Sequence, residues 1–326
     1  MTSTNQPISE KSAVSTRTIQ RAIIVVGVLL ILVLTAFSAY YYWDRFAPRG
    51  AASPTEIAIQ EAIQAVKEDP QNPDLRLNLA RLYYENRMYD LALEQTQQLL
   101  QVAPDSQEAL LIAGMSHVRL GHAAEAIPLL QKVIDVRKES ATAKSDMILE
   151  MLYYFVGESY IKKGEFAEAI APLQEAMTIM PTDADAAYQL GLAYQGLGKH
   201  EDAVEQFHAA VRFVPDFSEA YEGMITSYKA LHRPGYTEYA EGMLAFTKKD
   251  YQTAEAHLLK AVDALPQFVP ALLGLGLTYE KMGDYTAAQD ILQKAVSTDP
   301  HDLASRQALG RVQASLKAMQ TQEQSQ

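Results

Sequence analysis

The sequence predicts an all-α protein, namely an α-solenoid of repeated helix pairs preceded by one transmembrane helix. Two observations lead to this fold class. An uninterrupted apolar segment lies near the N-terminus, at residues 22–42. From residue 73 onward, similar stretches recur, mostly at a spacing of 34 residues, and their apolar positions follow a helical period.

The composition supports helices and excludes several kinds of site. Runs of Val, Ile and Thr with period-two alternation are almost absent after residue 50, which argues against a sheet. The chain contains no Cys, so disulfides, thiolate metal sites and Cys nucleophiles are excluded. The first 49 residues hold five basic and two acidic side chains, which leaves 23 basic and 38 acidic for the rest of the chain. Such an acidic domain would repel a phosphate backbone, so we expect no nucleic-acid partner.

The apolar segment has the length of a membrane span. Residues 22–42 contain no charged side chain, and as a helix they would cover about 31 Å, close to the ~30 Å hydrocarbon core of a bilayer. An aromatic cluster at residues 40–43 suits the headgroup layer. We therefore expect a transmembrane helix over 22–43, after a disordered tail at 1–21 and before a linker at 44–55.

Two properties of this segment stay open on sequence grounds. The alternative to an anchor is a cleaved signal peptide with Arg17 and Arg21 as its basic region, although the apolar run is longer than is usual there. Three basic residues precede the span and two follow it. By the positive-inside rule, this small bias places the N-terminus in the cytoplasm and the solenoid on the outer, extracytoplasmic side of the membrane.

Six aligned units share columns of residue types from residue 73 onward. Each unit has a small residue in its first helix, Ala in its second helix and, in five of the six, a closing Pro. A small residue lets paired helices approach closely, and Pro ends a helix because it lacks the amide N–H. Glycines between the paired helices are expected as left-handed caps. The units start at residues 73, 107, 150, 184, 235 and 269, and the small column holds Ala80, Gly114, Gly157, Gly191, Gly242 and Gly276.

This pattern resembles the tetratricopeptide repeat (TPR), a helix–turn–helix unit of 34 residues. The resemblance implies a right-handed α-solenoid over residues 56–318, in which the first helices line a concave face that takes an extended or helical peptide. Residues 303–318 are expected to be the capping helix, and residues 319–326 a disordered tail.

The repeat spacing departs from regularity in two places. The starts at 107 and 150 are 43 residues apart, so nine residues near 138–146 are extra, and they predict a lengthened loop or a helix extension. An extra half repeat at 218–234 precedes the unit that starts at residue 235, where Glu241 occupies an apolar column.

The inward-facing positions of the family predict a mostly apolar and aromatic groove. Chaperone adaptors of the family carry a carboxylate-clamp Lys where this chain has Leu77, Leu111, Tyr154 and Tyr188, so we expect no clamp. The groove suits an amphipathic helix or a hydrophobic segment of a partner. Alternatively, these side chains pack between adjacent first helices or against a second copy of the chain. The candidate groove residues are Leu77, Arg81, Tyr84, Leu111, Met115, Val118, Tyr154, Glu158, Ile161, Tyr188, Leu192, Gln195, Glu222, Leu273 and Leu277.

The sequence shows no constellation of catalytic residues. The seven His residues are scattered without an HExxH motif, and there is no GxSxG motif. We expect no enzyme activity, no catalytic, cofactor-binding or metal-binding residues, no cofactor and no small-molecule substrate. The predicted function is that of a single-pass, membrane-anchored scaffold, which binds protein or peptide partners and recruits or assembles a complex. The alternative is a chaperone-like holder of exported or unfolded polypeptides.

Overall fold

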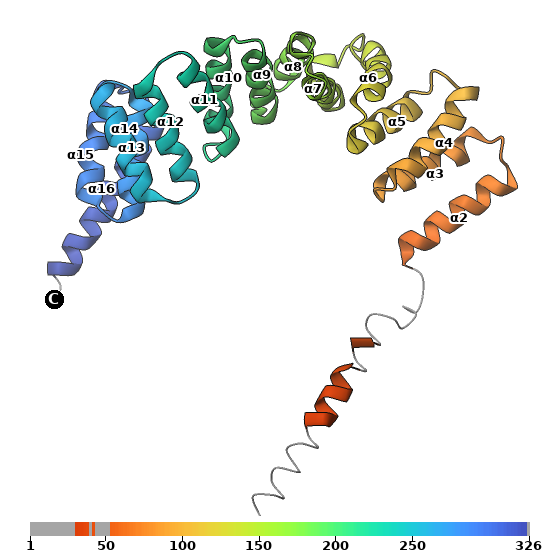
Figure 1. The fold of residues 1–326 in the computed structure, drawn as a ribbon, viewed down its shortest axis with the longest axis horizontal. Coiled ribbons are helices and arrows are strands. Elements are labelled where there is room, and N and C mark those ends of the chain that lie inside the picture. Colours follow the sequence, from red (N-terminus) through yellow and green to blue (C-terminus); the bar gives the residue numbers. More distant parts are fainter. Residues whose placement is uncertain (1–29, 39–40, 43–52, 325–326) are drawn as a thin grey trace, which may run out of the picture. The chain divides into compact units, whose positions relative to one another are not determined.

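The computed structural model describes residues 30–38, 41–42 and 53–324, and the regular elements of these residues are helices (Figure 1). The chain divides into two compact units, residues 1–60 and residues 61–326. Helix α2 (Pro54–Glu68) crosses the boundary between them. The all-α prediction is confirmed for the described residues.

The N-terminal predictions are only partly covered by these residues. The tail at 1–21 lies outside the described residues, as do residues 44–52 of the expected linker. Of the predicted transmembrane helix at 22–43, residues 30–38 and 41–42 are described, and both stretches are helical. Among the described residues, no helix combines the length and the apolar composition that a membrane crossing requires.

Residues 61–326 form a linear array in which each helix packs against its neighbours in the chain. Several helices begin where the repeats were expected to start, at residues 73, 107, 184 and 269. The helices are α3 (Pro73–Glu85), α4 (Tyr89–Val102), α5 (Gln107–Leu120), α6 (Ala123–Arg137), α7 (Met147–Lys162), α8 (Phe166–Ile179), α9 (Ala184–Gly196), α10 (His200–Phe213), α11 (Ser218–Ala230), α12 (Pro234–Thr247), α13 (Tyr251–Ala264), α14 (Val269–Met282), α15 (Tyr285–Thr298) and α16 (Leu303–Gln324).

The paired helices pack closely because a small residue faces a large apolar one. A Cβ atom on Gly191 of α9 would lie 2.6 Å from the Phe207 ring of α10, which is fully buried. Gly276 of α14 stands in the same relation to Leu292 of α15, at 2.5 Å. The glycines of the small-residue column therefore let the two helices approach closely. The large side chain of the second helix occupies the space that a Cβ methyl group would take on the first.

Each hairpin turn contains one residue in the left-handed conformation, as expected for the glycine caps. Four of these residues are glycines, which adopt a positive φ without steric cost. The other three are not glycines, and they include both residues that flank α12. The left-handed residues are Gly121, Gly164, Gly198 and Gly283, with φ between 72° and 82°, and Arg87, His232 and Lys249, with φ between 53° and 61°.

The nine extra residues form both a longer loop and a helix extension. A 3-10 turn, η1 (Ala143–Ser145), follows α6, and α7 begins at Met147, ahead of the expected start at residue 150. Asp146 caps α7 by accepting hydrogen bonds from Ile148 and Leu149 N–H. Its carboxylate also accepts hydrogen bonds from Nε and Nη2 of Arg137, at 2.9 and 3.0 Å. This ion pair connects the insertion to the end of α6.

The extra half repeat places α11 before a helix that belongs to two hairpins. The turn from α11 to α12 closes with the hydrogen bond from Arg233 N–H to Tyr228 O, at 3.0 Å. The turn from α12 to α13 closes in the same way, from Asp250 N–H to Ala245 O. Helix α12 is therefore the second helix for α11 and the first helix for α13.

The core is a series of clusters along the array rather than one central core. One cluster joins α5, α6 and α7, another joins α7, α8 and α9, and a third covers α9 to α15. Each cluster spans adjacent repeats, as expected where repeats contact only their neighbours. At the C-terminal end, α16 continues to Gln324, where a disordered tail from residue 319 was expected, because residues 319–324 contain neither Gly nor Pro.

Candidate functional site

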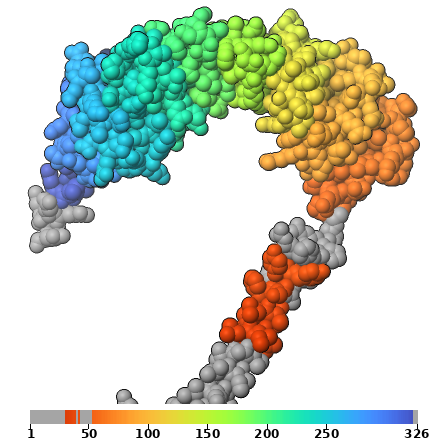
Figure 2. All heavy atoms as spheres, viewed as in Figure 1, coloured from red at the N-terminus to blue at the C-terminus, as the bar shows by residue number. Residues whose placement is uncertain are grey.

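The first helices of the repeats line the hollow side of residues 61–326. Contacts join α3 to α5, α7 to α9, α9 to α11, α12 to α14 and α14 to α16, whereas comparable contacts between second helices are absent in the described region. In a curved stack, the elements on the inner side are the ones that approach each other. Figure 2 shows this curvature as a hollow on one side of the body. Helices α5 and α7 make no comparable contact, because the insertion spaces them apart.

Two of the predicted groove residues belong to the core. Met115 and Val118 are only 4% and 8% exposed, and they pack in the cluster that α5, α6 and α7 share. They therefore do not line an open groove. The family positions are inward-facing in regular repeats, but here both side chains pack in a cluster to which Leu149 and Leu152 of α7 also belong.

Most of the other candidates are half-buried against the clusters between repeats. Tyr84 and Leu111 pack on the α5–α7 cluster. The remaining apolar candidates lie on the neighbouring clusters, so they contribute to the interface between repeats as well as to the inner face. These are Tyr154 and Ile161 on α7, Tyr188 and Leu192 on α9, and Leu273 and Leu277 on α14, while Leu77 on α3 is half-buried too.

The polar candidates connect successive first helices. Arg81 of α3 donates to Glu108 of α5 from its Nε atom at 2.8 Å. Gln195 of α9 donates to Gly223 O at 3.0 Å and to Ser227 Oγ at 2.9 Å, both on α11. These bonds fix the spacing of the inner face, which supports the alternative that part of the predicted groove is structural.

Tyrosines and acidic side chains meet on the inner face of α7, α9 and α11. Burial, Glu158 and Asp185 together raise the pKa of Tyr154 to about 12. Burial, Glu219 and Glu222 raise the pKa of Tyr188 above its ordinary value.

Asp185 itself has a raised pKa, first through burial and then through the negative charges of Asp183 and Glu219. Within residues 53–324, no Lys or Arg lies within ion-pair distance of Asp185 or Glu219. We call Tyr154, Glu158, Asp185, Tyr188, Glu219 and Glu222 the acidic tyrosine strip. Glu158 pairs with Lys162 at 3.0 Å and Glu222 lies 3.6 Å from Lys248, so the negative charge without a basic partner in residues 53–324 is that of Asp185 and Glu219.

A polar cavity of about 530 Å³ opens between α11 and α12. Lys229, His232 and Arg233 provide basic groups to its lining, and Glu238 and Glu241 provide acidic ones. In the sequence, this cavity is indicated by Glu241, a charged residue at a repeat position that is apolar in the other units. One helix earlier, Ile225 occupies the column that holds Gly191 in α9.

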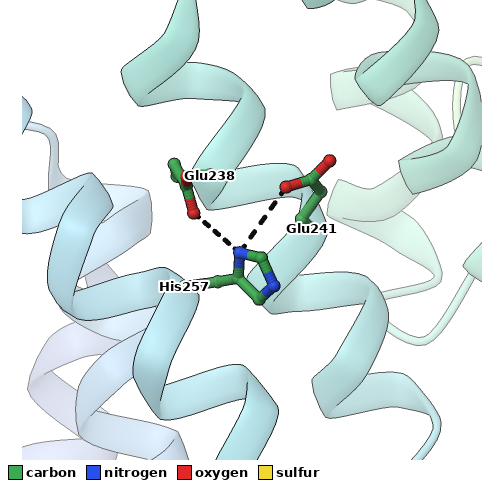
Figure 3. A group of neighbouring side chains, drawn as sticks. All are labelled: Glu238, Glu241 and His257. Atoms are coloured by element: carbon green, nitrogen blue, oxygen red, sulfur yellow. Dashed lines mark hydrogen bonds and ion pairs between the residues drawn. The ribbon is translucent and has the colours of Figure 1, made fainter.

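Three potential metal ligands lie beside this cavity (Figure 3). Glu238 and Glu241 of α12 both face the His257 ring of α13. No metal site was expected from the sequence, because the histidine lies on the next helix and the usual spacing motifs do not connect it to the glutamates. A pair of glutamates three residues apart was the one signal that could have indicated the cluster.

A second histidine is half-buried in an aromatic network at the same end of the array. His208 of α10 lies 2.8 Å from the Tyr228 hydroxyl of α11, and its ring stacks on Tyr239 of α12 with centroids 6.2 Å apart. Burial, with a smaller contribution from Arg212, lowers the pKa of His208 to about 4. The neutral ring therefore acts as a packing element here.

Comparisons with known proteins place these repeats in a family. Family models described as tetratricopeptide repeat match residues 57–115 and 245–318, residues 184–216 and residues 108–140, and one described as TPR repeat matches residues 157–198. No curated protein sequence matches the chain.

Several solved structures resemble the fold at low sequence identity. MamA is 23% identical, with a TM-score of 0.47 over 53% of this chain and 96% of its own. YrrB, described as a TPR protein with an unusual peptide-binding site, is 21% identical, with a TM-score of 0.46 over 66% of this chain and 97% of its own. A tetratricopeptide repeat protein from Parabacteroides merdae is 14% identical, with a TM-score of 0.45 over 85% and 96%. On the strength of the family models, residues 57–318 of this chain contain tetratricopeptide repeats.

Proposed function

We propose that the chain is a membrane-anchored scaffold whose repeats bind a protein or peptide segment along the acidic tyrosine strip. The partner segment carries basic side chains next to apolar ones. The observation that carries this proposal is the juxtaposition of the half-buried Tyr154 and Tyr188 with Asp185 of α9 and Glu219 of α11, two carboxylates that have no basic partner within residues 53–324.

The chemistry of the strip favours this class of partner. Lys or Arg side chains of a bound segment would neutralise Asp185 and Glu219, whose charges repel each other in the free protein. Tyr154 and Tyr188 offer aromatic surface for apolar or cationic groups. Complementary charge adds mainly to specificity and association rate, and the aromatic contacts add to affinity.

The anchor is proposed from the sequence. Residues 22–42 are uncharged, and the described residues 30–38 are helical with exposed apolar side chains. With the N-terminus in the cytoplasm, the repeats would recruit or assemble a complex on the extracytoplasmic side of the membrane. A protease-protection assay in sealed, right-side-out cells tests this topology, and an intact repeat domain would contradict it.

The binding proposal is tested by charge reversal with a matched control. Glu219→Lys/Glu222→Lys reverses two exposed charges of the strip, whereas Glu175→Lys/Glu205→Lys makes the same change on exposed positions of the second helices α8 and α10. Full-length wild type and both variants would be used in affinity purification from native membranes. We expect the first variant to lose the partners of the wild type and the second to keep them. Equal loss or equal retention in both variants would contradict a role for the strip.

The alternative function is a chaperone-like holder that uses the same inner face without partner specificity. Such a protein suppresses aggregation of unrelated unfolded proteins, whereas a scaffold enriches a few partners. An aggregation assay with two unrelated client proteins separates the two functions.

A further inference from the structure

Three side chains with metal-binding chemistry converge between α12 and α13 (Figure 3). Glu238 and Glu241 are three residues apart on α12, so both carboxylates lie on one face of the helix. His257 of α13 directs its Nδ1 atom at them, 2.6 Å from Glu238 Oε2 and 3.5 Å from Glu241 Oε2. All three candidate ligand atoms lie within 4.8 Å of one another. We propose that these residues bind a divalent transition metal ion of the Zn²⁺ class.

The distances between the candidate ligands are close to those that a metal requires. Zn²⁺ binds imidazole nitrogen and carboxylate oxygen at about 2.0–2.2 Å, so two ligands of a tetrahedral site are roughly 3.3–3.5 Å apart. The distance from His257 Nδ1 to Glu241 Oε2 is 3.5 Å, which already lies in this range. The distance from His257 to Glu238 is that of a hydrogen bond. The Oε2 atom of Glu238, whose side chain is 27% exposed, must therefore withdraw from His257 Nδ1 by less than about 1 Å to take a ligand position.

Two lysines hold the outer oxygens of the carboxylates. Lys229 Nζ lies 2.8 Å from Glu241 Oε1, and Lys260 Nζ lies 3.6 Å from Glu238 Oε1. In each carboxylate, Oε1 faces a lysine and Oε2 remains available to bind the metal ion. Outer-shell partners orient metal ligands in this way. The two positive charges also repel a dication, so they reduce the affinity of the site.

The site has room for further ligands. Glu238 and Glu241 line the cavity of about 530 Å³ between α11 and α12, which opens to solvent. Three protein ligands leave the fourth tetrahedral position to water. Because α12 carries two ligands and α13 carries the third, the metal would connect the two helices at the point where the regular repeat pattern is interrupted.

The proposal is tested with the full-length protein and ZnCl₂, by isothermal titration calorimetry. We expect saturable binding of one ion, weakened more than tenfold by His257→Gln because an imidazole ligand is lost. The matched control is His122→Gln, since His122 and His117 place their Nδ1 atoms 3.4 Å apart and form a histidine pair that a metal could use instead. We expect this control to bind like the wild type. Circular dichroism verifies that both variants are folded.

A third variant tests the role of the lysines. Lys229→Met removes a positive charge beside Glu241 without removing a ligand, so we expect tighter Zn²⁺ binding and a larger rise of the unfolding temperature on adding Zn²⁺. The proposal is overturned if the wild type shows no saturable binding, or if binding survives in His257→Gln and is lost in His122→Gln. In the latter case the ion belongs to the His117–His122 pair.

Discussion

The hairpins α9–α10 and α11–α12 lie one repeat apart and share the same turn, but they pack differently. Lys199 N–H donates to Tyr194 O in the first turn, and Arg233 N–H donates to Tyr228 O in the second. In the first hairpin, Gly191 faces the fully buried Phe207 ring. In the second, the same columns hold Ile225 and Glu241.

This difference shows that turn geometry and helix packing are set separately. The turn depends on local hydrogen bonds and on one left-handed residue, which both hairpins have. Close packing depends on a small residue opposite a large apolar one, which only α9–α10 has. Where the pair is missing, a polar cavity opens and a charged side chain occupies the position of the core aromatic residue.

The largest expected effect comes from removing the aromatic residue of the regular hairpin. Phe207 is fully buried and contacts Gly191, Gly223 and the Tyr188 ring. We expect Phe207→Ala to lower the free energy of unfolding by about 3–5 kcal/mol, because the deletion leaves a cavity in a rigid site. Urea denaturation followed by circular dichroism measures the change. The control Phe213→Ala, at a side chain that is 42% exposed, should cost less than about 1 kcal/mol.

A second effect concerns His208, the half-buried histidine beside the irregular hairpin. The pKa of His208 is lowered to about 4 in the folded protein, whereas an unfolded histidine has a pKa of about 6.5. Between these values the unfolded state binds more protons, so stability is lost as the pH falls from about 6.5 to about 4, by at most roughly 3 kcal/mol. His208→Gln should remove this dependence.

The measurement is the difference in unfolding free energy between the wild type and His208→Gln at several pH values. A difference is needed because Glu150 acts in the opposite direction. Burial and Asp183 raise its pKa to about 7, so its contribution to stability is lost as the pH rises through that value. If unfolding free energy depends on pH in the same way in both proteins, the pKa of His208 is the same in the folded and unfolded states, which contradicts the prediction.

The small column of the regular hairpin can be tested by adding one methyl group. The Cβ atom of Gly191→Ala would lie 2.6 Å from the Phe207 ring, so we expect a loss of about 1–3 kcal/mol from overpacking. Gly310→Ala on α16 is the matched control, because no atom lies within 4 Å of its Cβ position. There we expect a gain of about 0.5–1 kcal/mol from reduced backbone entropy. Thermal unfolding compares the two, and the same sign for both would contradict the packing argument.

The smallest effect concerns the turns. Lys249, between α12 and α13, has a φ of 61°, whereas the equivalent turn between α9 and α10 has Gly198 with a φ of 72°. Lys249→Gly should stabilise the protein by up to about 1 kcal/mol, and Gly198→Ala should destabilise it by a similar amount, because a side chain is strained in the left-handed region. If Lys249→Gly is destabilising, backbone entropy outweighs the strain at this turn.

The repeats and their turns could be predicted from residue types because they depend on local patterns. Gly121, Gly164, Gly198 and Gly283 were expected as left-handed caps, and this is confirmed. The inner face could be predicted only in part. Family positions point to the first helices, but they do not indicate that Met115 and Val118 are buried in the cluster that α5, α6 and α7 share. Coverage depends on how the side chains of neighbouring helices pack together, and residue types alone do not specify that packing.

The sequence by itself determined the helical repeats, the half repeat and the position of the insertion, because the spacing of small residues, Ala and Pro is a property of the chain. Only the tertiary structure decided which surfaces are open and which side chains meet. It brought Asp185 and Glu219 together from successive first helices, and Glu238 and His257 from α12 and α13. Such encounters depend on the distance between helices, which is set by how their side chains pack and not by the period of the sequence.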